Sequence, residues 1–189
     1  SDLFNIGSIE LIETKTTIER VCVPLVGGMR SFFFRVDLIR SWRMKVILVN
    51  GPCGAGKTTT TKALHKKLPQ SVLINIDLVR SFISGYREHP SRSWKTGLNL
   101  SLALAASAMQ QDRDIIVDKM IFDANAWEPF YHLAEEFNAE VQEFIIWAEK
   151  DVVLNRCDAR GDYTEGVFTR ESCERYWNKV KDFSEQRPQ

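Results

Sequence analysis

The chain has 189 residues, of which 44% are hydrophobic and 26% are charged, which is typical of one globular domain and excludes a disordered or fibrous protein. Its 25 lysines and arginines are matched by 25 aspartates and glutamates. A protein that binds nucleic acid over its whole surface is usually basic, so the neutral charge disfavours that class while still allowing one basic cleft.

The N-terminal region shows no regular hydrophobic period, because Pro24 and two nearby glycines interrupt its apolar stretch. Two interpretations of residues 1–43 stay open. In the first, residues 1–43 are an extension of non-native origin. In the second, residues 32–36 add an edge strand to the sheet. The regular pattern opens at Met44, which we expect to be the start of the main domain, residues 44–189.

Strands and helices are expected to alternate along the rest of the chain. Residues 45–50 form a short, β-branched apolar run, which predicts a strand buried on both faces. Further strands are expected at residues 72–76, 114–118 and 141–148. Helices are expected over residues 58–68, from Leu78, over 96–111, along the apolar stripe 127–137, and over 173–183 with Thr169 as N-cap. The alternation predicts a three-layer α/β/α fold, in which helices cover both faces of a parallel sheet of four to five strands.

The segment Gly51–Thr58 matches the phosphate-loop pattern G-x-x-x-x-G-K-[ST] and lies between a predicted strand and a predicted helix. Its glycines let the backbone turn and bring N–H groups against phosphate oxygens, and the helix N-terminus attracts the same anion. Lys57 would bridge the β- and γ-phosphates, and the Thr58 hydroxyl would ligate Mg²⁺. The pattern therefore predicts a site for ATP with Mg²⁺, formed by Gly51, Pro52, Cys53, Gly54, Ala55, Gly56, Lys57, Thr58 and Thr59.

Charged residues follow the predicted strands. Asp118 ends the strand at 114–118, where a Walker B carboxylate holds Mg²⁺ directly or through water; the alternative is an aspartate that caps a turn. Asp77 ends the strand at 72–76, and Arg80 faces the same way one helical turn later. At this edge of the sheet, Asp77 could accept the proton of an attacking hydroxyl while Arg80 holds the acceptor. The alternative for this pair is a helix cap with a surface ion pair.

Arg156 and Arg160 share a predicted helix face after the last strand and precede a glycine-containing loop. They could close over the nucleotide as a short lid, residues 156–168, and neutralise charge on the transferring phosphoryl group. The alternative is a solvated face paired with nearby aspartates. The polar stretch 87–95 could line an acceptor pocket, and a solvated loop explains it equally well.

Over residues 44–183, the chain resembles the small P-loop kinases related to the kinase domain of polynucleotide kinase, to zeta toxins and to chloramphenicol phosphotransferase. The resemblance depends on the phosphate loop, on the Asp77-x-x-Arg80 pair, on Asp118 and on the segment from Arg156 to Arg160. It implies that Asp77 acts as general base toward a substrate hydroxyl and that the lid arginines contact the ATP phosphates.

The expected function is a kinase that moves the γ-phosphoryl group of ATP·Mg²⁺ to a hydroxyl of a small molecule or nucleotide, with catalytic residues Lys57, Asp77, Arg80, Arg156 and Arg160. The alternatives are a kinase for 5′-hydroxyl ends of nucleic acids and a slow ATPase that serves as a nucleotide-dependent switch. The four cysteines form no CxxC pair, which predicts neither a disulfide framework nor a structural zinc site. No apolar run approaches the roughly 18 residues of a membrane span, so we expect a cytoplasmic protein without membrane contact.

Overall fold

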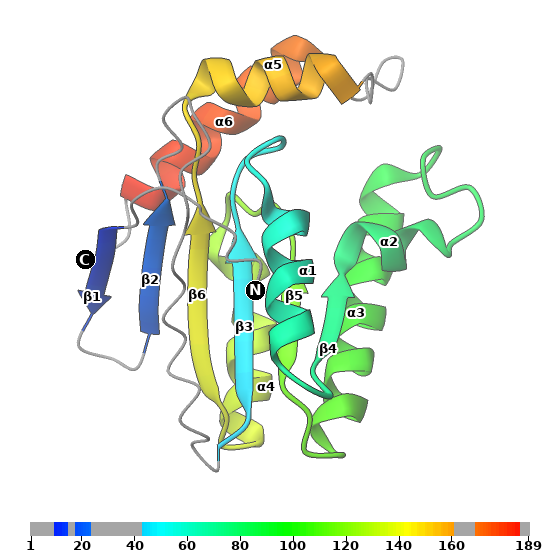
Figure 1. The fold of residues 1–189 in the computed structure, drawn as a ribbon. Coiled ribbons are helices and arrows are strands. Elements are labelled where there is room, and N and C mark those ends of the chain that lie inside the picture. The colour runs from blue at the N-terminus through cyan, green and yellow to red at the C-terminus, as the bar shows by residue number, and fades with distance from the viewer. Residues whose placement is uncertain (1–9, 15–17, 24–42, 161–168, 186–189) are drawn as a thin grey trace.

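The computed structural model describes residues 10–14, 18–23, 43–160 and 169–185. Their strands form one six-stranded sheet with the order β1-β2-β6-β3-β5-β4 (Figure 1). The strands are β1 (Glu10–Thr14), β2 (Ile18–Val23), β3 (Lys45–Asn50), β4 (Val72–Asn75), β5 (Ile115–Asp118) and β6 (Glu140–Ile146).

Four parallel strands make up the body of the sheet, as the sequence predicts. β3 lies between β5 and β6, and β4 pairs with the other side of β5. The bounds of β3 agree with the prediction, and its residues Val46, Ile47 and Leu48 are fully buried, as parallel sheets require. Because the four strands are parallel, the segments that follow β3, β4 and β5 emerge at one edge of the sheet (Figure 1).

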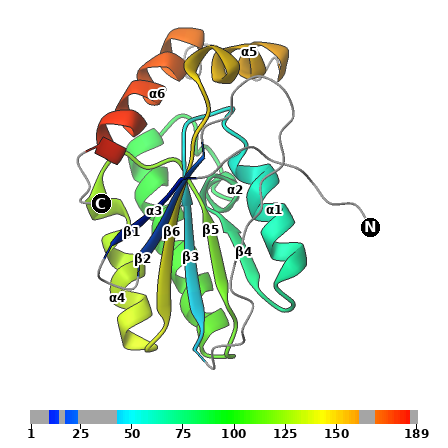
Figure 2. The same ribbon diagram turned by 60° about the vertical axis from the view of Figure 1, so that its left-hand side comes forward.

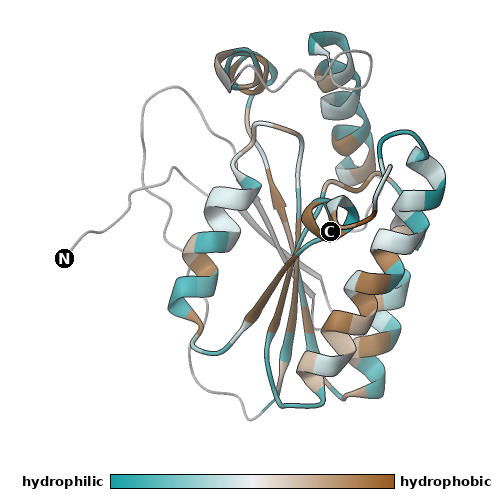
Figure 3. Cartoon of the chain, turned by 90° about the vertical axis from the view of Figure 1, so that its right-hand side faces the viewer, coloured by the Kyte–Doolittle hydropathy of each residue, from teal (hydrophilic) through white to brown (hydrophobic). Residues whose placement is uncertain are grey.

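Helices cover both faces of the sheet, which confirms the three-layer α/β fold. Side chains alternate along β3, so that Ile47 and Val49 pack with Leu64 in one core, whereas Leu48 packs with Phe130 in the other. Figures 2 and 3 show α1 on one face, α3 and α4 on the opposite face, and α5 and α6 beyond the carboxyl ends of the strands. The helices are α1 (Lys57–Lys67), α2 (Ile76–Ser81), α3 (Pro90–Met109), α4 (Glu128–Glu136), α5 (Lys150–Arg160) and α6 (Arg170–Glu185), with a 3₁₀ turn at Ala124–Ala126.

The predicted N-cap of the last helix is correct in its details. The Thr169 hydroxyl accepts a hydrogen bond from the backbone N–H of Ser172 at 3.2 Å, and the Ser172 hydroxyl accepts one from the N–H of Thr169 at 2.8 Å. This reciprocal capping satisfies two donors that a helix start otherwise leaves unpaired.

α3 begins earlier than the sequence analysis predicts, at Pro90 rather than at residue 96. Proline at the first helical position has its φ angle already set for a helix and lacks only an N–H that would find no helical partner. Trp94 and Lys95 therefore lie in the first turns of a helix. Of the two interpretations of the polar stretch 87–95 that stayed open, the solvated loop does not hold for this part. Among the described helices, none combines the length and apolar character that a membrane crossing demands.

Two N-terminal strands extend the sheet beyond the four predicted ones. β1 and β2 pair in antiparallel fashion, and β2 joins β6 in parallel through Cys22 opposite Ile145 and Val23 opposite Ile146. The sequence analysis missed both strands, because charged residues divide them into runs too short to stand out. Its own candidate edge strand at residues 32–36 lies outside the described residues.

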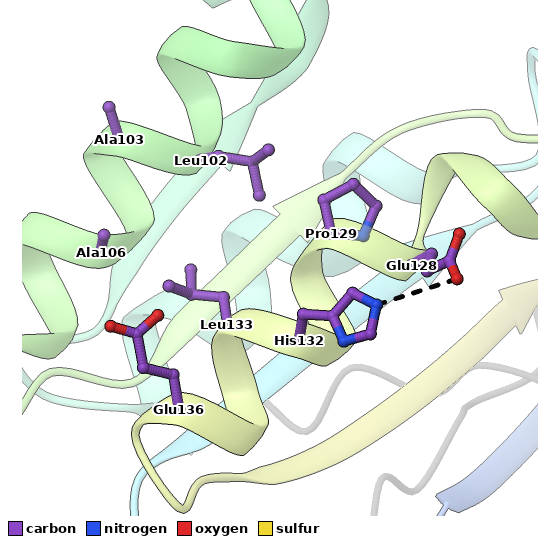
Figure 4. A pocket seen from close by; sticks show the side chains of 8 residues that line it. All are labelled: Leu102, Ala103, Ala106, Glu128, Pro129, His132, Leu133 and Glu136. Atoms are coloured by element: carbon purple, nitrogen blue, oxygen red, sulfur yellow. Dashed lines mark ion pairs between the residues drawn. The ribbon is translucent and has the colours of Figure 1, made fainter.

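A hollow of about 730 Å³ opens between α3 and α4 and is lined by apolar side chains such as Leu102 and Leu133 (Figure 4). On its rim, His132 pairs with Glu128. All the lining residues belong to α3 and α4 and none to the phosphate loop, so the hollow is separate from that loop.

Candidate active site

The phosphate loop joins β3 to α1 and lies so close to its neighbours that two positions require glycine. Gly51 has a φ of 146° and Gly54 a φ of 73°, values that side chains disfavour. A Cβ atom on Gly51 would lie 2.2 Å from the carbonyl oxygen of Ile146, and one on Gly54 would lie 2.8 Å from that of Val153. The loop is thus held between the end of β6 and the helix α5.

The N-terminus of α1 is open toward the loop. Gly56 occupies the N-cap position, and among the described residues no side chain caps this end and no acidic residue lies in its first turn. The uncapped N–H groups and the helix dipole form the positive cradle that phosphate oxygens prefer. The loop entrance is fixed by the buried Asn50, whose Oδ1 accepts hydrogen bonds from the N–H groups of Gly51 (2.7 Å) and Ile121 (2.8 Å).

Lys57 turns its ammonium group back over the loop. Its Nζ donates to the carbonyl oxygen of Pro52 at 2.9 Å, and burial lowers the pKa of Lys57 below its usual value, although nearby Asp118 opposes that shift. The loop thus holds a partly desolvated cation whose partner is a neutral carbonyl. An anionic ligand would stabilise this cation more strongly than the carbonyl does.

Thr58 and Asp118, the two predicted metal ligands, are in direct contact. Asp118 ends β5 and is 3% exposed, and its Oδ2 accepts from the Thr58 hydroxyl at 2.8 Å. Asn75, at the end of β4, donates to the same oxygen at 3.1 Å. Hydroxyl and carboxylate oxygens suit Mg²⁺, so this pair fits the predicted metal. The sequence analysis overlooked Asn75, which a search for polar residues at strand ends would have found.

Asp77 lies in the first turn of α2, and its carboxylate forms an ion pair with Lys119. The side chain of Asp77 is 60% exposed, whereas that of Lys119 is only 12% exposed. The Lys119 Nζ also lies 4.8 Å from the centroid of the Trp94 ring, a cation–π contact. The sequence analysis missed Lys119, although this residue directly follows Asp118 at the end of β5 and so emerges at the same edge of the sheet.

Arg80 contacts the start of α3 and the segment before it. Its Nε donates to the Ser93 hydroxyl at 2.9 Å and its Nη2 to the Tyr86 carbonyl at 3.3 Å, while its backbone packs closely on Gly97. These contacts link α2 to the start of α3. A role of Arg80 in holding the acceptor stays a prediction.

Of the two predicted lid arginines, Arg156 reaches the phosphate loop. Its Nη1 donates to the carbonyl oxygen of Gly54 at 3.3 Å, which sets a guanidinium group directly beside the loop. Arg160 ends α5, and its side chain lies outside the described residues, as does the rest of the predicted lid, residues 161–168.

Comparisons with known proteins bear on the family and the fold that carry this site. A family model described as an AAA domain matches residues 46–180. One similar structure is a chain of the Pnkp1/Rnl/Hen1 RNA repair complex, with 16% identity, a TM-score of 0.64, and coverage of 77% of this chain and 47% of that one. Another is the tunicamycin resistance protein of Deinococcus radiodurans, with 25% identity, a TM-score of 0.51, and coverage of 74% of this chain and 81% of that one. A candidate kinase from Chloroflexus aurantiacus has 21% identity, a TM-score of 0.57, and coverage of 69% of this chain and 75% of that one.

The chain spans about half of the repair-complex chain that it matches. No curated protein matches it significantly. The structural neighbours agree with the group of small P-loop kinases that the sequence resembles, and the family model covers well over half of the chain. The protein therefore belongs to the AAA-domain family of P-loop proteins and has a kinase-like fold.

Proposed function

We propose that the protein is a kinase that transfers the γ-phosphoryl group of ATP to a hydroxyl group of a small molecule. The observation that carries the proposal is the 2.8 Å contact between the Thr58 hydroxyl and the Asp118 carboxylate, because it joins the phosphate loop to an acidic residue at the next strand end. Both residues would hold Mg²⁺, which when bound neutralises charge on the β- and γ-phosphates. An exposed carboxylate, Asp77, at the same edge supports transfer rather than binding alone.

Lys57 would stabilise the transferring group. The energetic reason is the poor environment of its ammonium, which is partly desolvated and bound to the Pro52 carbonyl at 2.9 Å. A γ-phosphate oxygen carries negative charge and would replace that carbonyl favourably. Arg156, beside Gly54, would add a second cation, and Arg160 a third if the lid closes as the resemblance implies.

Asp77 would act as the general base. The acceptor hydroxyl would lose its proton to the Asp77 carboxylate while its oxygen forms a bond to the γ-phosphorus, and the bond from that phosphorus to the bridging oxygen would break to release ADP. Lys119 would act as a positioning residue, since its ion pair holds the exposed carboxylate at one place. Arg80, anchored on Ser93, would bind the acceptor from the side of α3.

The role of Lys119 has a matched control within the chain. Lys150 pairs with Glu174 at 3.0 Å and lies 5.3 Å from the Trp177 ring centroid, so it makes the same two kinds of contact at a distance from Asp77. Lys119→Met and Lys150→Met should each cost about 1 kcal/mol of stability, from an exposed ion pair and a cation–π contact.

Only Lys119→Met should lower kcat/KM for the acceptor, by about 10–100-fold because the base is misplaced, while KM for ATP stays constant. Equal kinetic effects of the two substitutions would show that Lys119 has no special role.

The nature of the acceptor has a second candidate. Tyr86 is flanked by the guanidinium groups of Arg80 and Arg87, and Trp94 is in contact with Lys119. Aromatic rings and cations close to a general base are also what a nucleic-acid end requires, since rings stack on bases and cations bind phosphates. The neutral charge of the whole chain and the likeness to a protein named for resistance to a small compound favour a small molecule.

The test is a transfer assay with ATP labelled in its γ-phosphate and with Mg²⁺. The panel contains hydroxyl-bearing metabolites, nucleosides and oligonucleotides with 5′-hydroxyl ends. We expect transfer to one small molecule or nucleoside, loss of transfer in Lys57→Ala, and a deep reduction in Asp77→Asn. Transfer to oligonucleotides alone would select the second candidate. Hydrolysis without any phosphorylated acceptor would support the alternative of a nucleotide-dependent switch.

We further propose that residues 44–189 form the functional domain and that the protein works in the cytoplasm. The family match over residues 46–180 supports the domain boundary. The cysteines Cys53, Cys157 and Cys173 carry free thiols, which supports a reducing compartment.

A further inference from the structure

Three cysteines that are far apart in sequence meet at the phosphate loop. Cys53 is the third residue of the loop, Cys157 lies within α5, and Cys173 lies in the first turns of α6. Their three sulfur atoms all lie within 4.8 Å of one another. The sequence analysis predicts no structural zinc site, because the cysteines form no CxxC pair, and spacing along the chain does not reveal that these three meet.

The surroundings of the three sulfurs are apolar. Cys157 is 3% exposed and Cys173 is fully buried, and Cys53 packs against the same core. Burial raises the pKa of Cys53 to about 11 and also raises that of Cys173, so these two thiols keep their protons at neutral pH when nothing is bound. A metal ion that binds to these two cysteines must therefore displace their protons.

The distances are close to those of a metal-bound thiolate set. A Zn–S bond is about 2.3 Å long, which puts the sulfurs of a tetrahedral or trigonal site roughly 3.8–4.0 Å apart. The three sulfurs therefore need to approach by at most about 1 Å to share one ion. Rotation of the half-buried Cys53 side chain can supply part of that approach, since the loop carries this residue at the open side of the cluster.

We propose that Cys53, Cys157 and Cys173 form a site for a thiophilic metal ion, Zn²⁺, with the fourth position left to water. Among the described residues, no histidine, aspartate or glutamate belongs to the group, so the ligand set is purely soft sulfur, which selects ions such as zinc. Three thiolates and one Zn²⁺ leave a single negative charge, and the Lys57 ammonium, which interacts electrostatically with Cys53, lies near enough to offset it.

Binding would form three sulfur–zinc bonds and release the three thiol protons to solvent. The ion would join the phosphate loop to both helices that follow β6, one of which carries Arg156 on Gly54. The proposal can be tested separately from the proposed kinase activity, because the measurement of metal binding needs neither ATP nor an acceptor.

The experiment uses the full chain, reduced and freed of metal with a chelator. Zn²⁺ is titrated against a chromophoric chelator in a weakly buffered solution, and Co²⁺ serves as an optical probe. We expect one ion per chain, release of close to three protons per ion, and a sulfur-to-cobalt charge-transfer band in the near ultraviolet. The absence of that band, or zinc binding without proton release, would overturn the proposal on the unmodified protein alone.

Substitutions identify the ligands. Cys53→Ser changes the cysteine that is only half-buried, so the fold should survive, which circular dichroism checks. Loss of an outer-shell partner costs about 10–100-fold in metal affinity. Because Cys53 is a direct ligand in this proposal, the zinc affinity of Cys53→Ser should fall by more than that. Cys22→Ser is the matched control, because Cys22 lies on β2 and not on the loop, α5 or α6. The zinc affinity of this variant should equal that of the wild type. If folded Cys53→Ser keeps the affinity and the cobalt band, the assignment is wrong.

Discussion

The pair formed by Thr58 and Asp118 allows a sharp test of the metal assignment. Asp118→Asn keeps the size of the side chain and removes its charge. Asp114→Asn is the matched control, because Asp114 precedes the same strand at the opposite edge of the sheet and accepts a hydrogen bond from the Lys45 N–H at 2.8 Å. Each substitution turns a carboxylate acceptor at one end of β5 into an amide, and only Asp118 is next to the phosphate loop.

The expected magnitude follows from the contacts of Asp118. Its Oδ2 takes hydrogen bonds from Thr58 at 2.8 Å and from Asn75 at 3.1 Å, so this one oxygen organises the proposed metal position. Loss of an outer-shell carboxylate costs about 10–100-fold in metal affinity, or roughly 1.4–2.7 kcal/mol, and loss of a direct ligand costs more. Without Mg²⁺ the sign changes, because the Asp118 carboxylate then repels the phosphates and its removal relieves that repulsion.

The assay is a fluorescence titration with an ATP analogue that carries a reporter on the ribose, performed with Mg²⁺ and again with a chelator. Asp118→Asn should bind at least about 10-fold more weakly with Mg²⁺ and as tightly as the wild type, or more tightly, without it. Asp114→Asn should match the wild type in both. An equal loss with and without Mg²⁺ in Asp118→Asn would refute the reasoning, since a general disturbance of the loop would then explain it.

Two further pairs of substitutions test the loop. Gly51→Ala should be strongly destabilising, because its Cβ would lie 2.2 Å from the Ile146 carbonyl oxygen. Gly56→Ala meets nothing within 4 Å and should cost only the roughly 1–3 kcal/mol of a strained φ. Urea denaturation measures both losses of stability, and equal losses would contradict the tight packing at Gly51. Burial lowers the pKa of Lys57, so the unfolded chain binds more protons and the folded protein is penalised at neutral pH. Lys57→Met should therefore raise the melting temperature at pH 7, and this gain should fade as the pH rises toward 10.5, the ordinary lysine value. The control is Lys62→Met at an exposed position, which should show no such gain. An equal gain in Lys62→Met would contradict the burial of the Lys57 ammonium as its cause.

The sequence was most informative where local chemistry dictates structure. β3 is β-branched and apolar along its whole length, and the glycines and Lys57 that follow it leave few alternatives. The contact of Thr58 with Asp118 was also predictable, because parallel strands deliver their carboxyl ends to one edge. The early start of α3 was within reach too, since Pro90 is a helix-start signal that the polar residues after it obscured.

What could not be predicted depends on contacts between distant segments. The ion pair of Asp77 with Lys119 joins residues 42 positions apart, and no spacing rule links them. The meeting of Cys53 with Cys157 and Cys173 requires α5 and α6 to pack over the loop. β2 joins β6 through only two residue pairs, so little in its own sequence marks it as part of the sheet.

The central claim is that the loop around Lys57 binds the phosphates of ATP. The most direct measurement is isothermal titration calorimetry of the intact protein with Mg·ATP, together with Lys57→Ala shown by circular dichroism to be folded. The account predicts one binding site per chain in the wild type and a large loss of affinity in the variant. A folded wild-type protein that gives no binding heat at several temperatures, or a variant that binds as tightly as the wild type, would contradict it.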